Sequence, residues 1–405
     1  MIVNQKCDST NDETNKLNYL FESSSLLPSD LINYPNQIGG HGLLFGNKCK
    51  ILYSHVQSTI YKPIQHYPKG PHELEFYQRL FDPNCHDSIL VELRKFVPDF
   101  CGLYRDSEQK HLYLGLKDLL ANFKHPSLCD LKMGRRTYAP DSSPSKIMIE
   151  CAKYKWREEI GFLVTGLKVF YPDINEHITF DIFFGRSLNP STIYDNGIRL
   201  FLGPNVNRAK RLAKQFVKKL TQLAKWFENQ NYYHFYASSL LLAYDSIFLN
   251  NEMMISSHPT TTTTSSSSTT TTTTTPSLHH HHNSSYQEDK EIMISNMEQN
   301  ETMLSPYATP SHHSHHHHHY HNSYQDHKEI MTSNMEDSVT EGEDEEKEEY
   351  VLVYLIDFTR WELVTNCNQI KDENFLYGLN YLIELFKRAS LDSTPLDKIP
   401  SLSIT

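Results

Sequence analysis

An acidic and a basic side chain share one face of the stretch HPSLCDLKMGRRTY, which covers residues 125–138. If the stretch is a strand, alternation places three apolar side chains on one side, and places Asp130 and Lys132, with Leu128, on the other. Burying a charge costs free energy unless the charge is paired or used. The two residues are therefore either a local ion pair, or a phosphate-steering lysine beside a carboxylate that holds a hydroxyl group.

A second lysine and a glutamate have types and positions that suit nucleotide binding. Lys62 lies in STIYKPIQ, directly before a proline, where a strand is expected to end. The following GPHELEFYQRLF has helical periodicity, and its helix is expected to begin near Pro71. Glu73 is spaced i, i+4, i+7 with Tyr77 and Leu80, so it borders the inward face and needs a cationic partner. Lys62 is the candidate, since protein kinases hold their phosphate-contacting lysine with a helix glutamate; a solvated surface lysine is the alternative.

A carboxylate also stands at the end of the apolar run VLVYLI. Asp357 follows this run directly. A carboxylate that terminates a buried strand suits a magnesium ligand, because ligands gather at strand ends in α/β sheets and Mg²⁺ prefers oxygen. A turn or helix cap is the alternative role for a single aspartate at this position.

A charged helix face is expected after residue 143. Ser143 and the proline that follows it have the types preferred at the N-cap and first position of a helix. The side chains at spacing i, i+4, i+7 and i+11 are Lys146, Glu150, Lys153 and Arg157. A solvated charged face is the simpler interpretation, and a clamp for substrate phosphates is the alternative, since lysine and arginine offer charge and several donors.

The elements that must position these residues are indicated by apolar runs and by helical periodicity. Strands are expected in GNKCKILYSHVQSTIYKP (46–63), KHLYLGLKDLL (110–120), FYASSLLLAYD (235–245) and YVLVYLIDF (350–358). Helices are expected in HELEFYQRLF (72–81), NRAKRLAKQFVKKLTQLAKWFENQ (207–230) and NFLYGLNYLIELFKRA (374–389). The order is β-rich first, then mixed α and β.

A long stretch of low complexity separates the last two expected strands. Residues 256–349 contain a threonine and serine tract, two polyhistidine tracts and the run EGEDEEKEE. They hold 16 acidic and 3 basic residues, a balance of −13 against −11 for the whole chain, so the remainder carries about +2. Such a composition cannot bury enough apolar surface to offset the entropy of ordering, and a disordered insert is expected.

Composition also bounds the class of protein. The seven cysteines form no C-x-x-C pair, so neither a disulfide framework nor a zinc site is indicated, and a reducing, intracellular compartment is expected. No stretch approaches 18 apolar residues, so no transmembrane segment is expected, and the polar first residues predict no secretory signal.

Several of these segments together resemble a known family. PSLCDLKMG matches the P-x-x-x-D-x-K-x-G signature of the inositol polyphosphate kinases, and GPHELEFY, FYASSLL, IDF and FLYGLNYLI are similar to the family's other blocks, in the same order. The resemblance runs from about residue 37 to residue 387, apart from the insert. It is strongest to the multikinase branch, through AKYKWREEIGFLVTGLKVF and WFENQNYYHFYASSLL; the hexakisphosphate kinases are the nearest competitor.

The resemblance implies an α+β, two-lobed, protein-kinase-like fold with ATP in the cleft between the lobes. The implied parts are a flexible tail (1–30), an N-lobe (31–116), a first C-lobe part (117–255) with an inositol-phosphate region near 138–160, the insert (256–349), and a second C-lobe part (350–405).

The resemblance also implies roles for single residues. Those implied to bind the nucleotide are Lys62, Glu73, Leu116, Asp118, Asp130 and Ser238. Leu116 and Asp118 belong to the hinge that meets adenine through backbone groups, and Asp130 holds the ribose hydroxyls. Lys132 reaches the transferring phosphate, so Asp130 and Lys132 are the implied catalytic pair, while Asp357 holds Mg²⁺. The residues implied to bind the inositol phosphate are Lys132, Lys146, Lys153 and Arg360.

Three departures from the family pattern bear on specificity. The hinge has Lys117 where the family usually has an acid, IMIECAK replaces a glutamine-rich stretch, and Arg360 replaces a histidine. The last two lie on the implied inositol side, so they affect which hydroxyl is phosphorylated more than whether phosphoryl transfer occurs. Arg360 adds a bidentate phosphate donor, which would favour a more highly phosphorylated substrate.

The expected function is ATP- and Mg²⁺-dependent phosphorylation of soluble inositol polyphosphates, in the nucleus, the cytoplasm or both. The enzyme alternative is a hexakisphosphate kinase that forms pyrophosphates, and the non-enzyme alternative is a scaffold that acts through the acidic insert. A monomer is expected, with no nucleic acid as partner, and the insert is where protein partners would bind.

Overall fold

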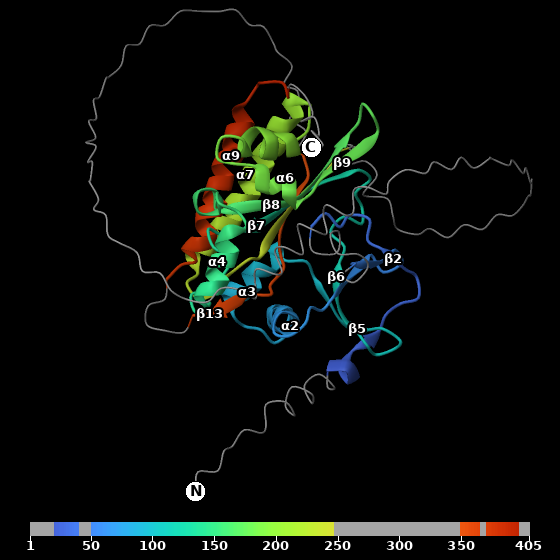
Figure 1. Cartoon of the computed structure of the whole chain (residues 1–405). Helices are drawn as coiled ribbons and strands as arrows, with labels where there is room; N and C mark the ends of the chain where they lie inside the picture. Colours follow the sequence, from blue (N-terminus) through green and yellow to red (C-terminus); the bar gives the residue numbers. More distant parts are fainter. Residues whose placement is uncertain (1–19, 40–49, 247–348, 365–369, 397–405) are drawn as a thin grey trace, which may run out of the picture. The chain divides into compact units, whose positions relative to one another are not determined.

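A six-stranded sheet forms the first part of the chain (Figure 1), which we describe from a computed structural model of residues 20–39, 50–246, 349–364 and 370–396. Its strands are β1 (Ser25–Leu26), β2 (Leu31–Asn33), β3 (Leu52–Ser54), β4 (Thr59–Pro63), β5 (Phe100–Arg105) and β6 (Leu112–Lys117), in the order β1-β5-β6-β4-β3-β2. The pair β1 and β5 is parallel, and the other pairs are antiparallel. This sheet is the β-rich N-lobe that the sequence predicted.

Helix α2 (Lys69–Leu80) places Glu73 in the interior of this region. Its buried side chains include Leu74, Phe76, Tyr77 and Leu80, which are spaced for one apolar face. The ring of Phe76 stacks on Phe358 with centroids 4.2 Å apart, so α2 packs directly against the residue that follows Asp357. The next elements are the short helix α3 (Ser88–Leu93) and the 3₁₀-helix η3 (Arg94–Phe96).

A five-stranded antiparallel sheet forms the second lobe. Its strands are β7 (Pro126–Met133), β8 (Phe162–Tyr171), β9 (Glu176–Phe180), β11 (Ser239–Asp245) and β12 (Val351–Ile356), in the order β12-β11-β7-β8-β9. The register sets Ser239 opposite both Lys132 and Ile356, so the signature strand β7 and the end of β12 meet at one end of β11. A separate two-stranded ladder joins β10 (Tyr233–Phe235) to β13 (Trp361–Leu363).

Helices cover the second sheet and complete its core. They are α4 (Pro144–Ala152), α5 (Arg157–Ile160), α6 (Ile182–Ser187), the π-helix η4 (Ile193–Arg199), α7 (Val206–Asn229) and α9 (Glu373–Leu391). The two long helices α7 and α9 lie side by side in Figure 1. Phe216 lies 4.9 Å from Phe386 between ring centroids, and Phe227 stacks on Phe375 at 4.3 Å, so aromatic pairs fill the seam between them.

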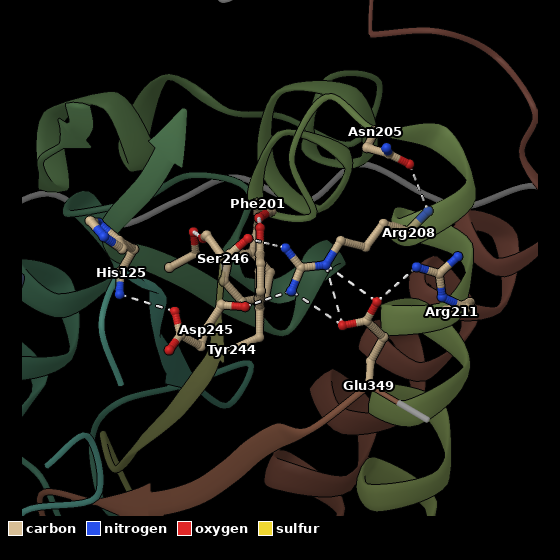
Figure 2. Close-up of polar contacts among 10 residues, drawn as sticks. His125, Phe201, Asn205, Arg208, Arg211, Tyr244, Asp245, Ser246 and Glu349 are labelled. Atoms are coloured by element: carbon tan, nitrogen blue, oxygen red, sulfur yellow. Dashed lines mark hydrogen bonds and ion pairs between the residues drawn. The ribbon is translucent and has the colours of Figure 1, made fainter. Parts of the chain in front are cut away.

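The two described ends of the chain around residues 247–348 are held by one arginine of α7 (Figure 2). Arg208 donates to both carboxylate oxygens of Glu349, and also to the carbonyl oxygens of Asp245 and Ser246. Arg211 adds a second ion pair to Glu349 at 3.0 Å. We call Arg208, Arg211, Asp245, Ser246 and Glu349 the neck. It places the last residues of β11 and the residues before β12 at the same point on α7.

Two sequence-based boundaries differ from the structure. The tail expected up to residue 30 is already ordered from Leu20, because β1 pairs with β5 and Arg105 donates to the carbonyl oxygen of Phe21. The insert was expected to run to Glu349, yet Glu349 is buried in the neck. Most of that expected insert lies outside the described residues.

The strands expected in 110–120, 235–245 and 350–358 are confirmed in shorter form by β6, by β10 and β11, and by β12. The helices expected in 72–81, 207–230 and 374–389 are confirmed by α2, α7 and α9. The stretch 46–63 forms β3 and β4, and its first four residues lie outside the described part. Among the described helices, none is long and apolar enough to span a lipid bilayer.

Candidate active site

Lys62 and Glu73 form a buried ion pair between β4 and α2. The Lys62 Nζ lies 2.7 Å from Glu73 Oε1, and the Glu73 side chain is 1% exposed. Burial raises the pKa of Glu73, and the charge of Lys62 opposes that rise. Burial lowers the pKa of Lys62, but the charges of Asp357 and Glu73 outweigh it and raise that pKa overall. The partnership predicted from helix spacing is confirmed.

Asp357 completes this group from the second lobe. Its carboxylate forms an ion pair with Lys62 directly after β12. The backbone of Asp357 has φ of +64°, in the left-handed region that side-chain-bearing residues rarely adopt. Such conformations persist where surrounding structure enforces them, and they gather at functional turns. Lys62 therefore bridges one carboxylate from the first lobe and one from the second.

Asp130 and Lys132 lie on the same strand without pairing with each other. Both side chains are described, and no ion pair within 4.0 Å joins them. Asp130 is 7% exposed, and its Oδ1 has no hydrogen-bond partner among the described residues. Burial and then the charge of Asp357 raise the pKa of Asp130 to about 6. Burial lowers the pKa of Lys132. The local ion pair, one of the two alternatives for these residues, is therefore excluded, and both charges remain available to a ligand.

Two serines add further polar atoms without partners beside this strand. Ser238 and Ser239 are each 1% exposed, and within the described chain neither hydroxyl oxygen has a hydrogen-bond partner. The backbone carbonyl of Ser238 accepts from the amide of Met133, which fixes the end of β7 against β11. Buried polar atoms usually find partners, so this concentration of unpartnered ones beside Asp130 indicates a place that a polar ligand fills.

The predicted hinge has a different side-chain arrangement from the family pattern. Leu116 is buried at the end of β6, and the carboxylate of Asp118 accepts from Tyr34 Oη at 2.6 Å and from the amide of Leu120 at 3.0 Å. Lys117 is exposed and lies 3.8 Å from Asp99. The side chain of Asp118 thus braces the hinge itself, while adenine contact by the hinge backbone stays a prediction.

A basic group gathers at the start of α2, and one of its members was missed in the sequence. Partial burial, followed by the positive charges of Arg360, Lys146 and Lys132, lowers the pKa of Lys69. Four cations from four separate segments thus act on one another. Like charges are held together at a cost, and an anionic substrate would relieve it. Lys69 directly precedes Gly70-Pro71, so its place at a helix start was the signal that could have revealed it.

Two of these four cations, Lys146 and Arg360, also have partners within the protein. Lys146 and Lys153 both pair with Glu150, at 2.8 and 3.2 Å, and Thr137 donates to the same carboxylate at 3.0 Å. Although burial raises it, these partners lower the pKa of Glu150 to about 2. Arg360 donates to the carbonyl oxygen of Thr137 at 3.2 Å. Glu150 therefore positions the two lysines, whose side chains are 36% and 39% exposed.

The single charged face expected from Lys146 to Arg157 is wrong at its far end. Helix α4 ends at Ala152, and Arg157 begins the separate short helix α5. Arg157 is 6% exposed and donates to the carbonyl oxygens of Lys132 and Gly134. Between the two helices Tyr154 is buried, and its hydroxyl donates to the carbonyl oxygen of Leu188 at 2.9 Å. Arg157 therefore holds the backbone at the end of the signature strand, and it is not part of a phosphate clamp. The expected N-cap at Ser143, which accepts from the amide of Lys146, is confirmed.

The site also offers oxygen ligands of the kind that Mg²⁺ requires. Asp357 presents a carboxylate that is 37% exposed, beside the buried carboxylate of Asp130. Mg²⁺ in phosphate-handling sites is typically bound by one or two carboxylates together with substrate phosphates and water. Among the described residues, no group of three or more His, Cys, Asp or Glu side chains could hold a metal by itself. This donor set fits a cation that arrives with a nucleotide.

Comparison with known proteins agrees with the signature. The sequence model of the inositol polyphosphate kinase family matches residues 113–387. The human inositol polyphosphate multikinase is 36% identical over 211 residues, which cover 52% of this chain and 50% of that protein. Inositol hexakisphosphate kinase 3 of mouse is 27% identical over 165 residues, covering 40% of this chain and 39% of that protein. The match thus spans about half the length of the human, rat and mouse multikinases.

Solved structures give a more distant likeness. Inositol phosphate multikinase Ipk2 from S. cerevisiae, in complex with ADP and Mn²⁺, is 18% identical. The match covers 82% of this chain and 98% of that chain, with a TM-score of 0.47.

Proposed function

Because the chain belongs to the inositol polyphosphate kinase family, we propose that it transfers the terminal phosphate of ATP to hydroxyl groups of soluble inositol polyphosphates. The observation that carries this proposal is the meeting of Lys62, Glu73 and Asp357 with the unpaired Asp130 and Lys132. The preferred substrates would be inositol tris- and tetrakisphosphates, converted to tetrakis- and pentakisphosphates. Multikinases of human and rat are the more similar relatives, at 36% and 35% identity.

The nucleotide would be held mainly by groups that are already positioned. Lys62, braced by Glu73, would contact the phosphates, and the free oxygen of Asp130 would accept a hydrogen bond from the ribose. Ser238 would lie on the same side, and the backbone around Leu116 and Asp118 would meet adenine. These assignments are supported by geometry and by buried polar atoms that have no partner among the described residues.

A bound Mg²⁺ would neutralise the charge that develops on the transferring phosphate. Asp357 would hold it, which requires its carboxylate to exchange some of its contact with Lys62 for the cation. Phosphoryl transfer needs little covalent chemistry from the protein, so positioning and charge neutralisation would supply the rate. Lys132, on the strand next to Asp130, would reach both the transferring phosphate and the accepting hydroxyl group.

The inositol phosphate would bind the basic group formed by Lys69, Lys132, Lys146 and Arg360. Mutual repulsion among these cations would be relieved by the several phosphates of the substrate. Lys153, which shares Glu150 with Lys146, lies at the edge of this group. Arg360 would favour a more highly phosphorylated substrate, and the Arg360→His enzyme tests this: unchanged preference between tris- and pentakisphosphates would count against it.

The decisive experiment uses purified protein, ATP and Mg²⁺ with a panel of inositol phosphates, with the product isomers resolved. We expect monophosphate addition to tris- and tetrakisphosphates. Pyrophosphate formation from the hexakisphosphate would support the alternative enzyme class, whose members are less similar to this chain. Failure of a folded protein to consume any member would contradict the kinase function and favour a scaffold that acts through the acidic insert.

A further inference from the structure

One carboxylate lies within the basic group that we propose binds the inositol phosphate. Glu150 Oε1 lies 2.8 Å from Lys146 Nζ and 3.2 Å from Lys153 Nζ. Its second oxygen, Oε2, accepts from the hydroxyl group of Thr137 at 3.0 Å, and the carbonyl oxygen of Thr137 accepts from Arg360. The Glu150 side chain is 12% exposed, so it is held among these groups with part of its surface open to solvent.

This carboxylate is negatively charged at neutral pH. Burial raises the pKa of Glu150, but its two lysines and Thr137 together lower that pKa to about 2. The negative charge also acts beyond α4. Burial and then the neighbouring positive charges lower the pKa of Lys69, at the start of α2, and the charge of Glu150 opposes that shift. Any anion that enters the basic group therefore meets one fixed negative charge as well as the positive ones.

The lysines of the site fall into two kinds. Among the residues that the structure describes, Lys69 and Lys132 form no ion pair within 4.0 Å, so their full charge is available to a phosphate. Lys146 and Lys153 share the carboxylate of Glu150, so these three groups together carry a single positive charge. The part of the site at α4 is therefore less positive than the part formed by β7 and the start of α2.

A phosphate oxygen that binds either lysine at α4 must come close to Glu150. A charge-assisted N–O hydrogen bond is about 2.7–2.9 Å long, and both ammonium groups already contact Glu150 Oε1, so the phosphate oxygen would lie within about 6 Å of that atom. This separation is shorter than the Debye length of about 8 Å at physiological ionic strength, so salt does not remove the repulsion. A hydroxyl group can instead donate to the carboxylate, which only accepts hydrogen bonds.

We propose that Glu150 is a specificity-determining residue, which selects a free hydroxyl group where the inositol ring faces α4 and excludes a phosphate there. This inference rests on the proposed function, because it takes Lys146 as part of the substrate site. It narrows the substrate class to inositol phosphates that keep a hydroxyl group at this ring position. Inositol hexakisphosphate carries a phosphate at every ring position, so no orientation of that molecule avoids Glu150.

The test measures the Kd for an inositol trisphosphate and for inositol hexakisphosphate by calorimetry on the full chain. Glu150→Gln keeps the size of the side chain and an acceptor oxygen, and it removes the negative charge. The hexakisphosphate should then bind about 10-fold more tightly relative to the trisphosphate than it does to wild type. Glu158→Gln is the matched control, because it removes the same charge from an exposed glutamate that pairs with Arg135 at 3.4 Å. It should leave the ratio of the two Kd values unchanged.

A second variant separates the charge of Glu150 from its contacts. Thr137→Val removes the hydrogen bond to Oε2 and keeps the carboxylate, so the ratio of the two Kd values should stay as in wild type. If Glu150 only positions its lysines, both variants should weaken the two ligands equally, and that result would overturn the inference.

Turnover of the same ligands with ATP and Mg²⁺ tests the proposed function separately. A wild-type protein that binds the trisphosphate without phosphorylating it would contradict the kinase function, while the ratio of Kd values would still decide the role of Glu150. An active kinase whose ratio is unchanged in Glu150→Gln would overturn this inference alone. Absence of binding of both ligands by folded wild type would overturn the proposed function and this inference with it.

Discussion

Lys62 and Asp357 are separated by 295 positions in the sequence and form an ion pair in the folded chain. The contact brings the end of β12 to β4, across the two sheets. The neck lies at the other end of the β11–β12 ladder from this pair.

Asp357→Asn should abolish turnover while leaving the protein folded. The amide keeps the shape and can still accept from Lys62, but it lacks the negative charge that Mg²⁺ requires, so we expect kcat to fall about 100-fold or more. Product formation at saturating ATP and the thermal midpoint would be measured together. The matched control is Asp99→Asn, an exposed aspartate 3.8 Å from Lys117. A variant with more than a tenth of wild-type kcat would remove Asp357 from the metal site.

Acid pH should weaken ATP binding through Asp130. Burial and the charge of Asp357 raise the pKa of Asp130 to about 6, so the carboxylate is lost as the pH falls below that value. KM for ATP should then rise about tenfold per pH unit below pH 6 and be flat above it. Asp130→Asn should have a high KM throughout and lose this dependence. A profile that keeps its bend in the asparagine variant would assign the titration to another group.

The raised pKa of Asp130 also makes the stability of the fold depend on pH. Here acid favours the folded state, whereas it weakens ATP binding. The folded pKa is higher than the value of 3.8 for an unperturbed aspartate, so the folded state binds the proton more tightly than the unfolded state. The contribution of Asp130 to the free energy of unfolding therefore decreases as the pH rises from about 4 to about 6. Urea unfolding of wild type and Asp130→Asn across this window should show the difference shrinking on the acid side; equal pH slopes for the two proteins would contradict it.

Lys69→Met should weaken binding of the inositol phosphate and leave ATP binding unchanged. Lys69 interacts electrostatically with Arg360, Lys146 and Lys132, the other members of the proposed substrate site. Removing its charge-assisted contact to phosphate should therefore raise KM for the inositol substrate about 10-fold. KM for each substrate would be measured at saturation of the other. Lys95→Met serves as the surface control. An equal rise in KM for ATP would place Lys69 on the nucleotide side instead.

Arg208→Met should destabilise the fold through the neck (Figure 2). The Glu349 side chain is 2% exposed, and loss of Arg208 leaves it with Arg211 alone among its described partners. Leaving a buried carboxylate short of partners costs about 3 kcal/mol in the free energy of unfolding. Arg211→Met, which removes one peripheral contact, should cost about 1 kcal/mol. Chemical denaturation would compare the free energies of unfolding of the two variants. Equal losses would show that Arg208 contributes no more to the neck than Arg211 does.

Deleting residues 260–345 should leave kcat and both KM values within about twofold of wild type, since closure of a long loop contributes little to stability beyond its anchors. The control deletion, 260–349, also removes Glu349 and should lose stability as Arg208→Met does. A collapse of activity in the shorter deletion, with a normal thermal midpoint, would show that the insert takes part in catalysis or binding.

Local patterns in the sequence were sufficient for the parts of the site that depend on spacing along one element. Alternation placed Asp130 and Lys132 on one face of β7, and helical periodicity turned Glu73 inward toward Lys62. Neither pattern distinguished an ion pair from two separate charges, because the distance between the Asp130 and Lys132 side chains depends on what packs around them. In the structure Asp130 is buried, and no ion pair within 4.0 Å joins its side chain to that of Lys132.

What the sequence could not predict depends on contacts between distant segments. Lys69 joins the basic group because Phe76 of the same helix stacks on Phe358, a contact that no local pattern reports. Arg157 leaves the charged face because Tyr154 turns inward, where its hydroxyl donates to the carbonyl oxygen of Leu188.

The neck has a further consequence for building on this protein. Arg208 fixes both ends of the gap at the Tyr244–Val351 end of the β11–β12 ladder, and Asp357 follows the other end, about 17 Å away for five residues of strand. Cargo joined between Ser246 and Glu349 would therefore be attached at a fixed point whose geometry the core already sets. A fluorescent reporter or an affinity module inserted there would need no linker designed to bring the two ends together, because the core already holds them. The position is therefore suitable for inserting a second domain.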